Sequence, residues 1–287
     1  MTSHSCLHAP WAASSWPKPD RNEFPQFYEA RGHNFTLHAG DTLYIPNRYW
    51  HWVFSDSEPG EPTVAINMWT QNPHRGFSNC NLTDEATDIC GSEPMFLRGH
   101  ASQWPAVAKW TLPFLQQKAE EHGAAGLAAE QNRADKSAPP AIQGSQFAVG
   151  TCAKADHIYP EMFRRHVRQP GSPDTHMLTI DAMRKAMDDL KSGGHKGFGC
   201  SGVAPLDRIN PSLGKSDDIA LPPWMLPPSS MAEKPQINLW ITTGKVQSGL
   251  HFDESYNSLT VLQGTKYVYL FAPSESHLLY QTVQGSE

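Results

Sequence analysis

Residues 238–280 constrain the fold of this chain more than any other stretch, because β-branched and aromatic residues recur there in short runs. Two such runs flank Gln263-Gly264, which predicts a β-hairpin turn. His251 and Asp253 come shortly before this hairpin. Successive side chains of a strand point to opposite faces, so the imidazole and the carboxylate are expected to share one face. These residue types form two of the three ligands of a 2-His-1-carboxylate metal site.

Three further polar residues accompany this pair. A bare His-x-Asp motif arises often by chance, and alone it is more typical of a polar pair at the end of a strand. Ser248 precedes His251, Asn257 follows Asp253, and Lys266 follows the predicted hairpin turn. Lys266 stands just before an apolar run, so its ammonium is expected to point into a pocket, where a buried charge needs an anion.

Together these residues resemble the JmjC and cupin-like group of Fe(II)- and 2-oxoglutarate-dependent oxygenases. The resemblance rests on Leu239-Trp240-Ile241, Ser248, His251, Asp253, Asn257, Gly264, Lys266, Leu270-Phe271 and Pro273. It implies that His251 and Asp253 bind Fe(II), and that O₂ takes a remaining position on the metal. It also implies that Lys266 pairs with the distal carboxylate of 2-oxoglutarate, while Ser248 and Asn257 hydrogen-bond to this cosubstrate.

A second β-rich stretch lies at residues 35–69. Short runs there are separated by Gly, Pro and Asp turns, which is typical of a jelly roll. His51 stands in the aromatic run 49–52, and a lone histidine among aromatic residues is by default a core or surface residue. Residues 37–53, however, resemble the stretch that carries the second iron-binding histidine of the same oxygenase group. The resemblance implies that His51 is the third metal ligand and that Asn67 contacts 2-oxoglutarate.

The two stretches occur in the reverse of the family's order, because His51 comes 200 residues before His251. Two arrangements are open. The chain is either parts of two tandem units, each with an incomplete iron site, or one jelly roll assembled in permuted order. The strands near residue 271 would by themselves leave an unpaired edge and an exposed apolar face, and residues 35–69 have the complementary need. Edge pairing therefore favours the permuted assembly.

The expected fold class is mainly β with flanking helices (α+β), a double-stranded β-helix of the jelly-roll or cupin type. Amphipathic patterns predict a helix at 110–122, ended by Gly123, and a second helix at 180–190. The expected organisation is an irregular lead-in at 1–23, the C-terminal half of a jelly roll at 24–70 and a linker at 71–92. The N-terminal two-thirds of a second unit then follow at 93–287, with a flexible insertion at 124–150.

The composition argues against several other classes. The net charge of −6 and the pI near 6.1 give no electrostatic footprint for nucleic acid. No apolar run is long enough to span a membrane. The five cysteines are scattered without a Cys-x-x-Cys pair, which argues against a zinc knuckle and for reduced thiols. We therefore expect a cytoplasmic or nuclear protein.

The resemblance implies an oxygenase, and the acidic chain without a zinc or histone-reader motif favours hydroxylation of a protein side chain. A protein or peptide substrate is therefore expected. Lysine demethylation and hydroxylation of a modified nucleoside are less favoured within the same group. The alternatives from other classes are a catalytically inactive cupin-like interaction module, an incomplete fragment of a tandem JmjC protein, and a metal-dependent cupin of other chemistry.

Overall fold

The structure is a computed structural model that describes residues 19–57, 61–70, 93–131, 149–154, 198–220 and 235–280, together with residues 188 and 192. The predicted linker at 71–92 and nearly all of the predicted helix at 180–190 lie outside these residues. The described strands are β1 (Gly32–His38), β2 (Thr42–Ile45), β3 (Trp50–Asp56), β4 (Pro62–Thr70), β5 (Met95–Leu97), β6 (Val149–Lys154), β7 (Phe198–Pro205), β8 (Gln236–Gln247), β9 (Tyr256–Gln263) and β10 (Thr265–Phe271). The described helices are α1 (Pro105–Lys109), α2 (Leu112–Gln131) and α5 (Leu206–Ile209), with short 3₁₀ turns at Pro25–Glu29, Leu213–Lys215 and Pro273–Leu278.

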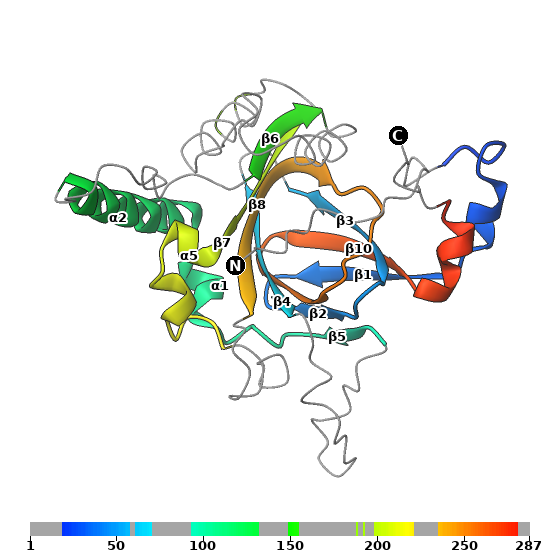
Figure 1. Cartoon of the computed structure of the whole chain (residues 1–287), viewed down its shortest axis with the longest axis horizontal. Helices are drawn as coiled ribbons and strands as arrows, with labels where there is room; N and C mark the ends of the chain where they lie inside the picture. Colours follow the sequence, from blue (N-terminus) through cyan, green and yellow to red (C-terminus); the bar gives the residue numbers. More distant parts are fainter. Residues whose placement is uncertain are drawn as a thin grey trace, which may run out of the picture.

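Strands from the two ends of the chain interleave in one nearly closed, barrel-like sheet. β10 lies between β1 and β3, β8 lies between β3 and β4, and β9 lies between β4 and β2 (Figure 1). Each of these pairings is antiparallel. The N-terminal strands thereby cover the edges that β8, β9 and β10 would otherwise expose. The fold is the expected jelly roll, and its strands follow the permuted order.

Within this barrel-like sheet, β8 passes from one layer of the jelly roll to the other. Its residues 236–243 pair with β4, whereas its residues 245–247 pair with β3. Gly244 stands between these two segments with a φ of +71°, a conformation that glycine adopts at little cost. One face of β8 therefore lines the interior along both layers, from Trp240 to the segment after β8 that carries His251.

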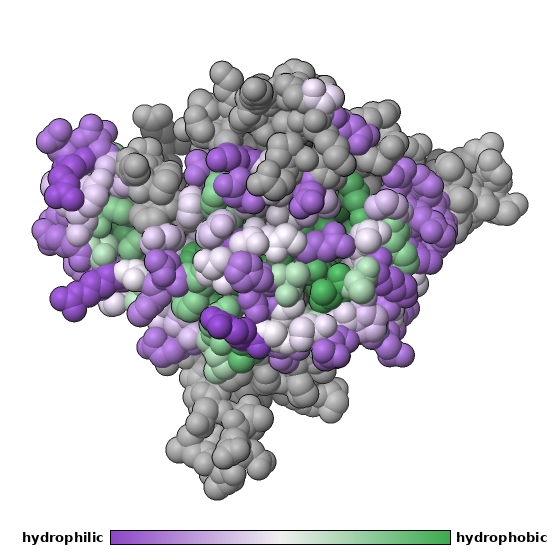
Figure 2. Space-filling view, turned by 180° about the vertical axis from the view of Figure 1, so that it is seen from behind, coloured by the Kyte–Doolittle hydropathy of each residue, from purple (hydrophilic) through white to green (hydrophobic). Residues whose placement is uncertain are grey.

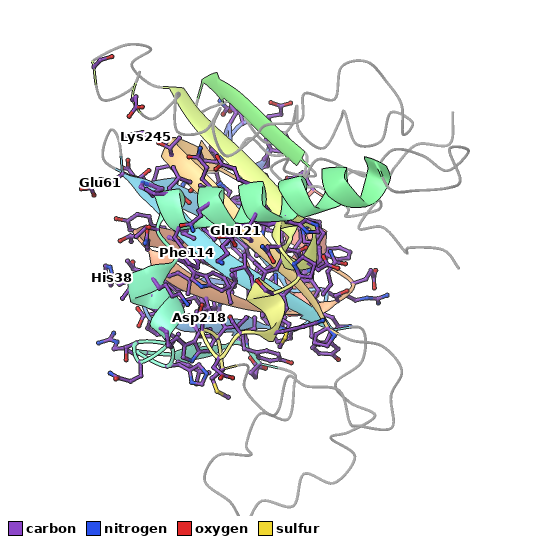
Figure 3. The ribbon with its side chains drawn as sticks, turned by 90° about the vertical axis from the view of Figure 1, so that its left-hand side faces the viewer. His38, Glu61, Phe114, Glu121, Asp218 and Lys245 are labelled. Atoms are coloured by element: carbon purple, nitrogen blue, oxygen red, sulfur yellow. The ribbon has the colours of Figure 1, made fainter. Side chains whose placement is uncertain are left out.

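Of the apolar clusters in the described residues, the two largest lie on the two faces of the sheet. The interior cluster includes Leu37, Leu43, Ala65, Val261, Val268 and Leu270. On the outer face, Trp104 and Trp110, which flank α1, and Leu115 of α2 share a cluster with the strand residues Val64, Ile66, Leu239 and Ile241. Figure 3 shows α2 crossing this outer face, while hydrophilic side chains predominate on much of the face seen in Figure 2. Each fully buried side chain of this size contributes roughly 1.5–3 kcal/mol.

The helical layer differs from the sequence prediction in one respect. α2 continues through Gly123 to Gln131, so the prediction that Gly123 ends this helix is wrong. The four residues Ala124, Ala125, Ala128 and Ala129 follow this glycine closely, and alanine has the highest helix propensity. The first eight residues of the predicted insertion at 124–150 therefore belong to α2, and residues 132–148 lie outside the described part of the chain.

Candidate metal centre

His51 and His251 face each other because their backbones pair directly. The His51 amide donates to the His251 carbonyl at 2.6 Å, and the His251 amide donates to the His51 carbonyl at 3.1 Å. Residues directly opposite each other in an antiparallel pair point their side chains to the same face. The two imidazole rings accordingly lie with their centroids 4.2 Å apart. Strand pairing thus brings together two histidines that are 200 residues apart in sequence.

Asp253 adds a carboxylate to the two imidazoles. Its Oδ2 lies 3.6 Å from Nε2 of His51, and one ligand-forming atom from each of the three residues lies within 4.8 Å of the others. The carbonyl of Asp253 accepts a hydrogen bond from the Arg48 amide at 2.8 Å. Arg48 has a φ of +64°, a left-handed conformation that costs a non-glycine residue about 1–3 kcal/mol and is concentrated at functional sites.

Hydrogen bonds hold both histidines in the tautomer that binds metal through Nε2. Nδ1 of His51 lies 3.0 Å from the Tyr49 carbonyl oxygen, and Nδ1 of His251 lies 2.7 Å from the Gly249 carbonyl oxygen. A carbonyl oxygen only accepts, so each Nδ1 carries the proton and donates it, while each Nε2 presents its lone pair. Metal-binding histidines characteristically donate their other ring N–H in this way.

Burial sets the protonation of the site. Desolvation lowers the pKa of His251 well below its usual range, and the neighbouring His51 lowers it further, so His251 is a neutral imidazole. Desolvation raises the pKa of the Asp253 carboxyl, which means that its negative charge is costly unless a cation compensates it. Two imidazole nitrogens and one desolvated carboxylate fit Fe(II), and these three side chains would hold it.

Lys266 lies on β10 and is only 4% exposed. Its Nζ donates to Oγ of Ser55 at 2.8 Å, and the described residues offer it no acidic partner. Burial lowers the pKa of Lys266 to about 8. The sequence reasoning did not find Ser55, because this contact depends on the register that sets Lys266 opposite Ser55 in the pairing of β10 with β3. No local sequence signal marks that register.

Asn67 and Asn257 belong to a hydrogen-bonded chain that ends at Asp253. Nε1 of Trp240 donates to Oδ1 of Asn67 at 2.9 Å, and an indole N–H can only donate. Nδ2 of Asn67 then donates to Oδ1 of Asn257 at 3.3 Å. The Asn257 side chain is in turn hydrogen-bonded to the Asp253 carboxylate, which lowers the pKa of this carboxyl against the effect of burial. Trp240 therefore fixes the direction of every bond in the chain.

One pocket contains all seven residues that the sequence singled out as metal ligands or cosubstrate contacts: His51, Asn67, Ser248, His251, Asp253, Asn257 and Lys266. The empty space in and in front of the pocket is about 770 Å³, with open solvent included. Ser248 ties β3 to the segment after β8, since its Oγ accepts a hydrogen bond from the Val53 amide at 2.7 Å. The remaining walls are mostly apolar and include Ile45, Val53, Trp69, Val246 and Leu259. Such walls limit the access of water to the polar groups.

A jelly roll with histidines and a carboxylate facing its interior defines a protein of the cupin class. A model of the cupin-like domain family matches residues 5–75 and 84–287. The chain therefore belongs to the cupin-like domain family, and proteins named for JmjC domains or JmjC-type demethylase activity are among the relatives that it matches. Members of this family are in general Fe(II)- and 2-oxoglutarate-dependent oxygenases.

Three relatives illustrate the similarity. The putative JmjC domain-containing protein L887 of Acanthamoeba polyphaga mimivirus is 22% identical over 267 residues, which cover 92% of this chain and 37% of the viral protein. HSPB1-associated protein 1 of Rattus norvegicus is 44% identical over 54 residues, 18% of this chain and 10% of that protein. Lysine-specific demethylase JMJ32 of Arabidopsis thaliana is 30% identical over 69 residues, 22% of this chain and 20% of that protein.

The matched segments thus span only 10–37% of the lengths of these relatives. No solved structure matches the chain. None of the helices in the described residues combines the length and the apolar character that crossing a membrane requires.

Proposed function

We propose that the chain is an Fe(II)- and 2-oxoglutarate-dependent oxygenase that hydroxylates a side chain of a protein substrate. The supporting observation is that one pocket holds both the His51–His251–Asp253 cluster and the buried Lys266, which has no acidic partner among the described residues. His51 and Ser55 lie four residues apart on the same face of β3, so their Cα atoms are about 13 Å apart. This span has room for a metal, a five-carbon diacid and the end of the Lys266 side chain.

Each part of the site then has a chemical task. Bound Fe(II) would supply, with 2-oxoglutarate and O₂, the oxidising chemistry that yields succinate and CO₂ from the cosubstrate. His51 and His251 present Nε2, and the backbone carbonyls fix their rings. Asp253 provides a negatively charged carboxylate, and the hydrogen bond from Asn257 orients this carboxylate. Lys266 offers an ammonium to the distal carboxylate, and the apolar walls keep water from competing for these groups.

The experiment that tests the proposal measures metal and cosubstrate turnover together. The full chain is reconstituted with Fe(II), its iron content is determined, and succinate formed from 2-oxoglutarate is followed with and without candidate protein substrates. We expect one iron per chain and slow succinate formation that a suitable substrate accelerates. A chain that binds iron but neither binds nor consumes 2-oxoglutarate would contradict the proposal.

A protein-interaction module without catalysis is the second candidate. The observation that favours it is the similarity over 54 residues to a protein whose name states an association with HSPB1. This candidate needs no cosubstrate in the pocket. Two results together would favour the interaction module. The chain would bind a protein partner equally well with and without iron and 2-oxoglutarate, and no succinate would form when both are present.

The hydrogen-bonded chain from Trp240 to Asp253 gives a prediction for metal binding. Trp240→Phe removes the N–H that holds Asn67 and so frees the amide of Asn257 to turn away from Asp253. Loss of such outer hydrogen bonds typically costs 10–100-fold in metal affinity. We expect Fe(II) affinity to fall by about 10-fold, with a changed visible spectrum of the Co(II)-substituted protein.

Trp69→Phe is the matched control for this prediction. Trp69 lines the same pocket, but its Nε1 has no hydrogen-bond partner among the described residues. The same chemical change there should leave the metal affinity and the Co(II) spectrum as in the wild type. Equal effects of the two substitutions would show that bulk and packing matter, and not the hydrogen-bonded chain.

A further inference from the structure

A residue in the left-handed conformation joins the two segments that carry the metal ligands. Arg48 stands three residues before His51, and Glu254 directly follows Asp253. The Arg48 amide donates to the Asp253 carbonyl at 2.8 Å, and Nε of Arg48 donates to Oε2 of Glu254 at 3.1 Å. The two segments are thus tied by a backbone contact and a side-chain contact, in addition to the His51–His251 bridge.

This connection departs from regular strand pairing. Between the His51–His251 bridge and the Arg48–Asp253 hydrogen bond, one segment covers residues 48–51 and the other only residues 251–253. One extra residue on one side is the defining feature of a β-bulge, and bulges next to active sites re-aim side chains. The φ of Arg48, +64°, gives the backbone the left-handed conformation that is typical of one bulge class. The direction of the Asp253 carboxylate therefore depends on this irregular step.

An arginine at this step needs an explanation, because glycine adopts a positive φ at little cost and arginine does not. Residues persist in such a conformation only where the surrounding structure over-determines it. What the arginine side chain adds is its contact with Glu254. The Arg48 and Glu254 side chains are 62% and 64% exposed, so their ion pair contributes little to the stability of the fold. Its place beside a metal ligand indicates a role in the site.

We propose that the Arg48–Glu254 ion pair is a latch that positions the carboxylate of Asp253 for the metal. The inference rests on the proposed function and adds two positioning residues to its metal centre. The latch closes a ring that runs from the Arg48 side chain to Glu254, along the backbone to Asp253, and back to the Arg48 amide. This ring restricts the backbone that carries the carboxylate. A site ordered before binding loses less conformational freedom when the ligand binds, so the latch raises metal affinity.

Titration of the metal-free full chain with Co(II) tests the latch without relying on turnover, because the visible spectrum of Co(II) reports ligand geometry as well as affinity. Arg48→Gly keeps the backbone amide and the positive φ but removes the side chain. We expect it to weaken Co(II) binding by about 10-fold, the lower end of the range for lost outer partners of a metal ligand, and to change the spectrum. The metal-free variant should be at least as stable as the wild type in chemical denaturation, because glycine relieves the left-handed conformation.

Glu254→Gln tests the same latch from its other side. It should weaken Co(II) binding by up to about fivefold, the range of an exposed ion pair, and should cause no further loss in the Arg48→Gly background, because both residues act through one contact. Arg48→Lys, which keeps a cation for Glu254, should retain most of the wild-type affinity. Asp56→Asn is the matched control, since Asp56 lies 3.6 Å from Nζ of Lys245 in another exposed ion pair. It should leave Co(II) binding unchanged.

The possible outcomes separate the latch from the metal centre. Wild-type Co(II) affinity and spectrum in both Arg48→Gly and Glu254→Gln would overturn the latch and leave the metal centre in place. A loss of folding stability in Arg48→Gly that accompanies the loss of Co(II) affinity would make Arg48 a structural residue, and would also overturn the latch. A wild-type chain that does not bind Co(II) would overturn the proposed function, and the latch with it.

Discussion

His51→Ala is expected to abolish Fe(II) binding while leaving the jelly roll intact. The pairing between residues 51 and 251 is made by backbone atoms, so it survives loss of the imidazole. Removing hydrogen bonds from the surroundings of a metal site already costs 10–100-fold in affinity. Losing one of three protein ligands should therefore cost more than about 100-fold. Iron content and equilibrium metal titration measure the effect, and circular dichroism checks the fold.

Asp253→Ala should give the same loss of metal with a different effect on the metal-free protein. Burial raises the pKa of the Asp253 carboxyl, so its charge opposes folding when no metal is bound. We expect the metal-free Asp253→Ala variant to be at least as stable as the wild type.

His33→Ala serves as the control for His51→Ala, because His33 is an exposed histidine on β1. If His51→Ala retained wild-type iron affinity, His51 would not be a ligand and the site would be incomplete.

The fold could be predicted largely from local patterns. The Gln263-Gly264 turn, the short strands between Gly, Pro and Asp residues, and the apolar faces all follow from the chemistry of neighbouring residues. The turn is present, with Gly264 at a φ of +77°. Permuted closure was favoured over two incomplete tandem units on a physical argument, because each half of the chain alone would leave unpaired edges that the other half could cover.

The finer features of the site depend on register and could not be predicted. Ser55 contacts Lys266 only because these two residues stand opposite each other across strands far apart in sequence. Resemblance implied that Asn67 contacts 2-oxoglutarate, and this stays a prediction; the hydrogen bonds of its side-chain amide to Trp240 and Asn257 were not predicted. A list of residue types contains no information about which partner an amide selects.

Lys266→Met is expected to weaken 2-oxoglutarate binding by roughly 2–5 kcal/mol, the cost of removing one partner from a buried charge pair. Methionine keeps most of the apolar stem, and iron binding should be retained. Calorimetric titration of 2-oxoglutarate into the Mn(II)-loaded variant measures the loss. Lys245→Met is the control, since Lys245 is an exposed lysine whose Nζ lies 3.6 Å from Asp56. A Lys266→Met chain that binds 2-oxoglutarate normally would show that Lys266 has no role in the pocket.

The pH dependence of the same lysine supplies an independent test. Burial lowers the pKa of Lys266 in the folded chain to about 8 from an ordinary value of 10.5. Between these two values the unfolded chain holds the proton and the folded chain has released it, so the free energy of unfolding rises with pH across this window. The rise approaches roughly 3 kcal/mol for the cosubstrate-free protein, and Lys266→Met should abolish it.

The affinity for 2-oxoglutarate should change with pH in the opposite sense. Since the carboxylate needs the ammonium, affinity should fall above about pH 8, by up to about tenfold per pH unit. Chemical denaturation and calorimetry between pH 7 and 10 measure both trends. A wild-type chain whose stability slope matched that of Lys266→Met would mean that Lys266 titrates as a solvated lysine.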